Sequence, residues 1–241
     1  MNTRIHKQDS LVIVYDADRI EQPGVHLFDP DHWRRQGGLV GEAKGRGSAL
    51  LLDTPFGPAV LRRCLRGGQA ARLSHDRYLF TGFNRSRPLA EFHMLEELSQ
   101  AGLPVPQPLA AICRRSGLFY TGWLITRRIM DVLPLAELLA ERDEDLRMWQ
   151  KTGYCVRRFH DHGVVHADLN ARNILVGAAD EIHLIDFDRA RISNNDSSAF
   201  SANLKRLRRS LEKLWPERTR DRLDPCWSIL MAAYDDRVER P

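Results

Sequence analysis

The stretch that decides the fold reads HADLNARN at residues 166–173, and the tripeptide DFD follows it at residues 186–188. Between them, the apolar runs 174–176 and 182–185 flank Gly-Ala-Ala-Asp at residues 177–180. Two short apolar runs around a turn of this composition predict a β-hairpin. The hairpin therefore joins a polar loop to a second, acidic turn.

The residue types in these two turns suit the transfer of a phosphoryl group. Asp168 can orient an acceptor hydroxyl or accept its proton, and Asn173 and Asp186 supply the hard oxygen ligands that Mg²⁺ prefers. We expect His166 to brace the loop through a hydrogen bond. Two surface turns that merely happen to carry acids are the alternative, but five residues matching around one hairpin argue against it.

The same residues resemble the catalytic motifs of the protein-kinase superfamily. That family's catalytic loop reads H-R-D-L-x-x-x-N, and D-F-G follows it after a short hairpin. His166, Asp168 and Asn173 stand at matching positions. The resemblance implies the use of ATP and Mg²⁺ and an α+β, protein-kinase-like fold of two lobes. A strand-rich N-lobe is expected over residues 1–128 and a helical C-lobe over residues 129–241.

Hydrophobic patterns along the chain agree with this division. Strands are predicted in the first half at residues 11–15, 48–52, 59–65 and 119–125, with one helix at residues 88–102. Helices are predicted in the second half at residues 135–140 and 145–160 and from about residue 202 onward. A strand-rich first half followed by helices is typical of an α+β protein.

The resemblance extends to a glycine-rich turn and to the first long helix. Gly41, Lys44, Gly45 and Gly47 fit the loop that covers the phosphates, because glycines let backbone N–H groups approach phosphate oxygens. Glu91 fits the glutamate that pairs with a lysine on the third strand. An ordinary hairpin turn and a solvated helix glutamate are the alternatives for these two features.

Two departures from the kinase pattern matter. Arg62 stands where the family carries the lysine of V-A-I-K, so either Arg62 or Lys44 is expected to clamp the phosphates. Asp188 replaces the glycine of D-F-G. The chain also leaves no room for a long activation segment after Asp188. These features argue against an ordinary protein kinase and keep open a regulatory module that binds nucleotide without turnover.

A closer resemblance is to the family of bacterial 3-deoxy-D-manno-octulosonic acid (Kdo) kinases. The motifs that carry it are RRCLRGG at 62–68, DRY at 76–78, GLPVP at 102–106, and the two turns at 166–173 and 186–188. This resemblance implies transfer of the ATP γ-phosphate to the 4-hydroxyl of a Kdo sugar on a lipid A precursor, in lipopolysaccharide inner-core synthesis. Such an acceptor is acidic and lipid-linked, and it suits Arg63, Arg66 and Arg72 as recognition residues. An inner-core heptose kinase and a soluble, antibiotic-type phosphotransferase are the alternatives.

Composition sets the cellular setting. The 241 residues carry a net charge of +4, mostly from arginine. This excess favours an anionic partner, and the alternative is that the arginine content only follows genome composition. Four cysteines without metal-type spacing argue against a zinc site or a disulfide framework and favour a reducing compartment. No apolar run approaches the ~20 residues of a membrane span. We therefore expect a peripheral protein at the cytoplasmic face of the bacterial inner membrane, with an anionic membrane surface and no nucleic acid as partner.

A basic stretch near the C-terminus has two interpretations. Its cations are interleaved with leucines, and they are Lys205, Arg206, Arg208, Arg209 and Lys213. The simpler interpretation is a surface helix with leucines in the core and charges in water. The other is contact with anionic lipid through the charged face.

Overall fold

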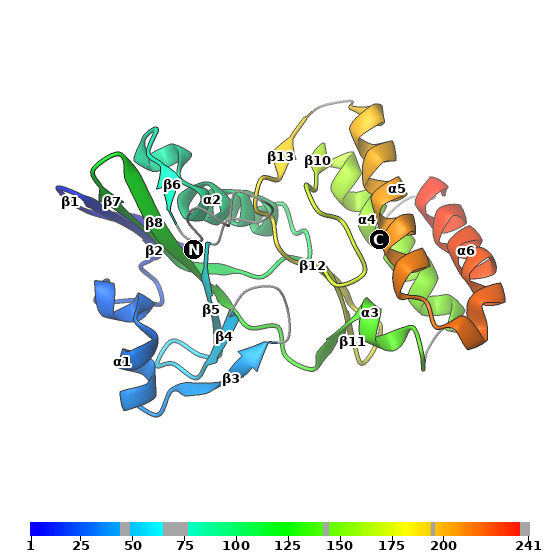
Figure 1. Ribbon diagram of the computed structural model, residues 1–241, viewed down its shortest axis with the longest axis horizontal. Helices are drawn as coiled ribbons and strands as arrows, with labels where there is room; N and C mark the ends of the chain where they lie inside the picture. Colours follow the sequence, from blue (N-terminus) through cyan, green and yellow to red (C-terminus); the bar gives the residue numbers. More distant parts are fainter. Residues whose placement is uncertain (44–48, 65–76, 142–144, 194–195, 237–241) are drawn as a thin grey trace. The chain divides into compact units, whose positions relative to one another are not determined.

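The computed structural model describes residues 1–43, 49–64, 77–141, 145–193 and 196–236 (Figure 1). The chain forms two compact units. The N-terminal unit comprises Met1–Glu97 and Pro106–Arg128, and the C-terminal unit comprises Leu98–Val105 and Ile129–Pro241. The segment Leu98–Val105 packs with the second unit, where the carbonyl of Pro104 accepts a 3.0 Å hydrogen bond from Leu184 N.

An antiparallel sheet dominates the N-terminal unit. Its strands are β1 (Thr3–Gln8), β2 (Leu11–Asp16), β3 (Leu39–Ala43), β4 (Ala49–Leu52), β5 (Ala59–Arg63), β6 (Tyr78–Leu79), β7 (Pro108–Ser116) and β8 (Phe119–Arg127). They run in the order β1-β2-β7-β8-β5-β4-β3, and β6 also pairs with β8. Helices α1 (Pro30–Arg35) and α2 (Arg87–Gln100) and the 3₁₀ turns Val25–Phe28 and Phe83–Arg85 complete this unit.

The strands predicted at 11–15, 48–52, 59–65 and 119–125 and the helix at 88–102 are confirmed as β2, β4, β5, β8 and α2. Five further elements of this unit, β1, β3, β6, β7 and α1, were not predicted. β1 is a sheet edge whose side chains are mostly exposed and polar, so its sequence lacks the alternation that marks a half-buried strand. Pairing with the apolar strand β2 decides its conformation.

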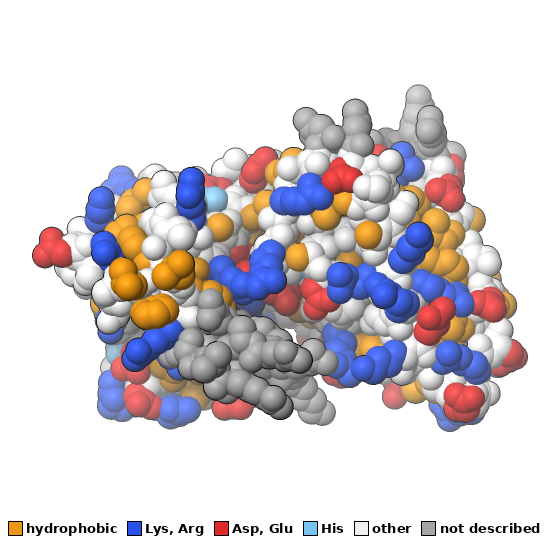
Figure 2. All heavy atoms as spheres, turned by 45° about the horizontal axis from the view of Figure 1, so that its top comes forward, with side chains coloured by type: hydrophobic (Ala, Val, Ile, Leu, Met, Phe, Trp, Pro, Cys, Tyr) orange, Lys and Arg blue, Asp and Glu red, His pale blue; other side chains and the backbone are white. Residues whose placement is uncertain are grey.

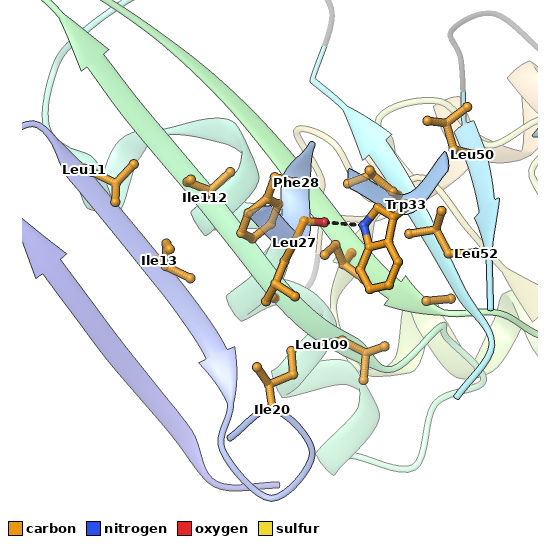
Figure 3. Close-up of a cluster of buried hydrophobic side chains, with 14 residues drawn as sticks. Leu11, Ile13, Ile20, Leu27, Phe28, Trp33, Leu50, Leu52, Leu109 and Ile112 are labelled. Atoms are coloured by element: carbon orange, nitrogen blue, oxygen red, sulfur yellow. Dashed lines mark hydrogen bonds between the residues drawn. The ribbon is translucent and has the colours of Figure 1, made fainter. Parts of the chain in front are cut away.

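A buried apolar cluster holds α1 against the sheet (Figure 3). Trp33 of α1 lies in this cluster and donates a 2.8 Å hydrogen bond from Nε1 to the carbonyl of Leu27. Asp29 caps the helix by accepting from Asp31 N, and Pro30 occupies its first turn. The helix has only six residues, so packing of Trp33 rather than propensity stabilises it.

The C-terminal unit is mainly helical. Its helices are α3 (Leu135–Leu138), α4 (Leu146–Asp161), α5 (Ser197–Leu214) and α6 (Leu223–Asp235), with a 3₁₀ stretch at Glu217–Arg222. Strands β9 (Val132–Pro134), β11 (Ile174–Gly177) and β12 (Ile182–Leu184) form a small sheet in the order β12-β11-β9. The short strands β10 (Val164–Val165) and β13 (Arg191–Ile192) pair with each other. The predicted hairpin and the helices predicted at 135–140 and 145–160 are confirmed.

Helix α4 forms the centre of this unit. Asp145 caps it by accepting from Met148 N at 3.1 Å, and its apolar face is buried. Gly153 allows α6 to approach closely, because a Cβ there would lie 2.2 Å from the carbonyl oxygen of Leu230. This rigid helix leads through β10 directly into the polar loop of residues 166–173.

Two further observations concern the cysteines and the lengths of the helices. Cys64, Cys113, Cys155 and Cys226 are all buried, and none of these four is part of a disulfide. Across the described ranges, the structure contains no helix that is long and apolar enough to cross a membrane.

Candidate active site

Strand pairing brings the two polar turns of the C-terminal unit together. The loop 166–173 leaves β10 and enters β11, whereas residues 186–188 follow β12 and precede β13. β10 pairs with β13, and Ile185 N donates a 3.0 Å hydrogen bond to the carbonyl of Asn173. The two turns therefore lie side by side at one end of the β11–β12 hairpin.

His166 is the buried brace of this arrangement. Its Nε2–H donates to the carbonyl of Ile185 at 3.0 Å, and its Nδ1 accepts from Asp168 N at 3.1 Å. The ring also packs against Phe187, with centroids 4.9 Å apart. Burial lowers the pKa of His166, so the ring is neutral, as this pair of bonds requires. The expected hydrogen bond thus connects the two turns.

The side chains that His166 supports are accessible. The carboxylate of Asp168 is 58% exposed, while the carbonyl of the same residue accepts a 2.9 Å hydrogen bond from Asn173 Nδ2. Because that bond fixes the amide, Oδ1 of Asn173 is the oxygen left for a ligand. Among the described residues no donor contacts it.

Asp186 has an uncommon backbone conformation. Its φ is +66°, in the left-handed region that Asp tolerates better than most residues. The next residue, Phe187, is fully buried and stacks on Phe159 with centroids 5.7 Å apart. Strained conformations persist where the surroundings hold them, often at functional sites. The anchored Phe187 holds Asp186 in this conformation.

The donor set fits Mg²⁺. Asn173 Oδ1 and the Asp186 carboxylate are hard oxygen ligands, and Mg²⁺ is usually held by one or two protein groups together with waters and phosphate oxygens. Within the described ranges, His, Cys, Asp and Glu side chains form no group of three or more that would enclose a metal ion. Because Mg²⁺ is octahedral, Asn173 and Asp186 alone would leave coordination positions for waters and phosphate oxygens.

The N-terminal unit contains the expected charge pair. Arg62 on β5 donates from Nη2 to both carboxylate oxygens of Glu91 on α2. Glu91 is 4% exposed, so its charge is stable there only when paired. Arginine thus forms the strand–helix ion pair that the resemblance assigns to lysine.

The other predicted residues have different surroundings. Gly41 lies on β3, where a Cβ would make an ordinary 3.6 Å contact with Leu51. Arg63 lies over the ring of Trp123 at 5.4 Å from its centroid. The remaining predicted residues fall outside the described ranges, and they are Lys44, Gly45, Gly47, Arg66 and Arg72.

Helix α5 contributes residues to the site that the sequence did not indicate. Asn203 is buried, its Oδ1 accepts from His166 N at 3.0 Å, and its Nδ2 donates to the carbonyl of His166 at 2.7 Å. Ser210, two turns later, accepts from Ala171 N at 3.2 Å. The one pattern in the sequence that could have indicated these contacts is the spacing of Asn203 and Ser210. They lie four residues before and three residues after Leu207, so the three side chains share one face of the helix.

The cations of α5 are placed differently from one another. Arg208 pairs with Glu212 at 3.0 Å and also with Asp224. Nη1 of Arg206 lies 3.6 Å from Oδ1 of Asp168. The leucines 207 and 211 are buried, as the surface-helix interpretation predicts, while Lys205, Arg206, Arg209 and Lys213 are exposed.

These features define a kinase-type site, and comparison with known proteins gives the family. The model of the lipopolysaccharide kinase (Kdo/WaaP) family matches residues 30–234, and the chain belongs to this family. A 3-deoxy-D-manno-octulosonic acid kinase of Stenotrophomonas maltophilia (strain K279a) is 45% identical over 225 residues, covering 92% of this chain and 89% of the relative.

Relatives from Xanthomonas carry the same name and are similarly identical to this chain. A protein of the same name from Xanthomonas axonopodis pv. citri (strain 306) is 44% identical over the same shares of both chains. Another from Xanthomonas campestris pv. campestris (strain B100) is 43% identical. The resemblance drawn from the motifs is confirmed.

Acid should lower the free energy of unfolding through His160. This buried histidine donates from Nε2 to Oδ1 of Asn203 at 3.4 Å. Burial lowers the pKa of His160 from 6.5 to about 4, so below pH 6.5 the unfolded chain binds a proton that the folded state excludes. Its contribution is complete above pH 6.5 and is lost as pH falls towards 4. We expect about 2 kcal/mol less unfolding free energy at pH 5 than at pH 7, measured by urea unfolding.

The control variants separate this effect from general acid sensitivity. His160→Gln should flatten the slope of unfolding free energy against pH, whereas His162→Gln, at an exposed position next to the helix end, should not. Equal slopes in the wild type and His160→Gln would show that other groups carry the acid response.

Proposed function

We propose that this protein transfers the γ-phosphate of ATP to the 4-hydroxyl of a Kdo residue on a lipid A precursor, in lipopolysaccharide inner-core biosynthesis. The observation that carries the proposal is the pair of braced turns presenting Asp168, Asn173 and Asp186. It is supported by 45% identity over 92% of the chain to a relative named as a Kdo kinase.

In this proposal each residue of the C-terminal unit has a distinct task. Asp168 accepts a hydrogen bond from the acceptor hydroxyl and orients it, and takes its proton as the phosphoryl group is transferred. Asn173 and Asp186 hold Mg²⁺. When bound, Mg²⁺ neutralises charge on the phosphates. His166 positions Asp168 through the backbone and does not itself contact the substrate.

The N-terminal unit is proposed to bind the nucleotide. We infer that the two compact units correspond to the two lobes of a kinase, divided near residue 128. The glycine-rich turn of Gly41, Lys44, Gly45 and Gly47 is proposed to cover the phosphates. Arg62, fixed by Glu91, is proposed to contact them in place of the usual lysine.

Acceptor phosphorylation tests the proposed activity. Incubated with ATP, Mg²⁺ and a panel of Kdo-lipid A precursor, heptosylated core and aminoglycoside, the protein should add one phosphate, detected by mass, to the first alone. Asp168→Asn should lower the rate by about 10²–10⁴ because the oriented acceptor is lost. Asp221→Asn, an exposed carboxylate of the same unit, should be neutral.

Each other result has a definite meaning. Transfer to the heptosylated core or the aminoglycoside would replace the Kdo acceptor with that one. ATP binding without turnover on any acceptor would favour the regulatory module. A fully active Asp168→Asn would remove Asp168 from its role.

Nucleotide binding separates the metal ligands from the phosphate clamp. Asp186→Asn should remove the Mg²⁺-dependent part of ATP affinity while leaving metal-free binding, because only the metal contact is lost. Arg62→Ala should lower the affinity for ATP both with and without Mg²⁺, and Arg62→Lys should retain part of that affinity. Calorimetric titration measures both. If Arg62→Ala binds ATP normally while Lys44→Ala is inactive, Lys44 and not Arg62 is the residue that clamps the phosphates.

We also propose that the protein docks on an anionic bilayer, at the cytoplasmic face of the inner membrane. An exposed apolar tip of the N-terminal unit supports this. Leu79 on β6 and Phe119 on β8 are cross-strand partners and are 58% and 42% exposed, and Leu118 beside them is 71% exposed. Arg114 and Arg115, on the neighbouring strand β7, are also exposed. Basic side chains therefore lie next to the exposed apolar ones. Figure 2 shows hydrophobic side chains with Lys and Arg at their border on this unit.

Vesicle binding tests the membrane proposal. The protein should sediment with vesicles of phosphatidylethanolamine and phosphatidylglycerol, less so as salt rises, because each basic residue contributes about 1 kcal/mol that salt screens. Leu118→Asp should weaken binding and Leu133→Asp, exposed in the other unit, should not. Arg66→Glu with Arg72→Glu should impair use of the lipid-linked acceptor but not ATP binding. Salt-insensitive binding, or no effect of these variants, would contradict it.

A further inference from the structure

The ion pair between Arg206 and Asp168 joins two elements that are far apart in the sequence. Nη1 of Arg206 lies 3.6 Å from Oδ1 of Asp168, and the two side chains are 48% and 58% exposed. A pair this exposed contributes little to stability. Stability therefore does not account for the arginine next to Asp168, the carboxylate proposed to orient the acceptor.

The backbone of α5 is fixed on both sides of Arg206. Asn203, three residues earlier, bonds the N–H and the carbonyl of His166, and Ser210, four residues later, bonds Ala171 N. Both partners belong to the loop that carries Asp168. The base of the Arg206 side chain is thus held at a constant position relative to Asp168, while its end remains open to solvent.

The guanidinium retains donors for a ligand. At 3.6 Å the contact with Asp168 is an ion pair beyond ordinary hydrogen-bond length, and a guanidinium carries five N–H donors in a planar fork. Such a fork matches a carboxylate in two-pronged geometry. Arg206 can therefore bind a second carboxylate without leaving Asp168.

An acidic acceptor needs such a group. The carboxylate of Asp168 orients a hydroxyl by accepting its hydrogen bond, but its negative charge repels a sugar that itself carries a carboxylate. A cation next to Asp168 offsets this repulsion and gives the sugar acid a partner. The two requirements meet at the position of Arg206.

We propose that Arg206 binds the carboxylate of the acceptor sugar while Asp168 orients the hydroxyl of the same sugar. Arg206 is then a residue that determines specificity for an acidic acceptor. The inference rests on the proposed function, because it takes Kdo, a sugar acid, as the acceptor.

A pair of soluble acceptors tests the inference in the full-length protein. One is a Kdo glycoside with a free carboxylate, and the other is its methyl ester, which lacks the charge. Wild type should use the acid about 10- to 100-fold better in kcat/KM, the range expected for one charge-assisted contact. Arg206→Ala should lose that factor on the acid and change the ester by less than about threefold. Arg206→Lys should recover part of it.

Two controls make the result specific. Arg209→Ala removes an exposed arginine one turn further along the same helix and should leave both acceptors unchanged. The affinity for ATP and the melting temperature should be the same in Arg206→Ala and the wild type, because the side chain is 48% exposed and its contact with Asp168 is an exposed ion pair of little stabilising effect.

Each other outcome decides against the inference. Equal losses on acid and ester would mean that Arg206 acts through Asp168 and not on the sugar carboxylate. A loss of ATP affinity would make it a nucleotide contact. If wild type phosphorylates the acid and Arg206→Ala does so equally well, the inference fails and the proposed function stands. If wild type phosphorylates neither soluble acceptor, the same comparison is made with the Kdo-lipid A precursor and its methyl ester, and the proposed function fails together with the inference only if these are not phosphorylated either.

Discussion

A single buried residue, His166, couples the parts of the C-terminal unit that the proposed chemistry needs. Its ring bonds the carbonyl of Ile185 and the N–H of Asp168, and its backbone is bonded on both sides by Asn203. Burial lowers the pKa of the ring and keeps it neutral, so the bonding pattern is stable near neutral pH. Loop, hairpin and helix α5 therefore form one rigid assembly.

The site combines a buried, fixed support with exposed functional groups, and this combination explains how it can act. The apolar stack of Phe187 on Phe159 and the buried polar contacts of Asn203 lie below the loop. Asp168 is exposed above it, and Asp186 has a left-handed backbone held by its anchored neighbour. Groups held in this way need little reorganisation when a substrate binds, which is the main contribution a protein makes to phosphoryl transfer.

Charge is arranged in the two units by different rules. The Arg62–Glu91 pair is partly buried, and its carboxylate depends on its partner because burial removes solvation. The Arg206–Asp168 pair is exposed, contributes little to stability and leaves both groups available. The first kind of pair holds β5 and α2 together, and the second suits recognition. Membership of the lipopolysaccharide kinase (Kdo/WaaP) family is consistent with both.

The sequence by itself determined the motifs, the hairpin, the main helices and the family, because these depend on local spacing and on periodic burial of apolar residues. It did not reveal β1 and α1, whose conformations depend on pairing with β2 and on the packing of Trp33. Nor did it place Asn203 and Arg206 at the loop, since contacts between residues some 37 positions apart leave no periodic pattern. Only the tertiary structure decided which face of α5 meets Asp168, because helix packing, and not local sequence, selects that face.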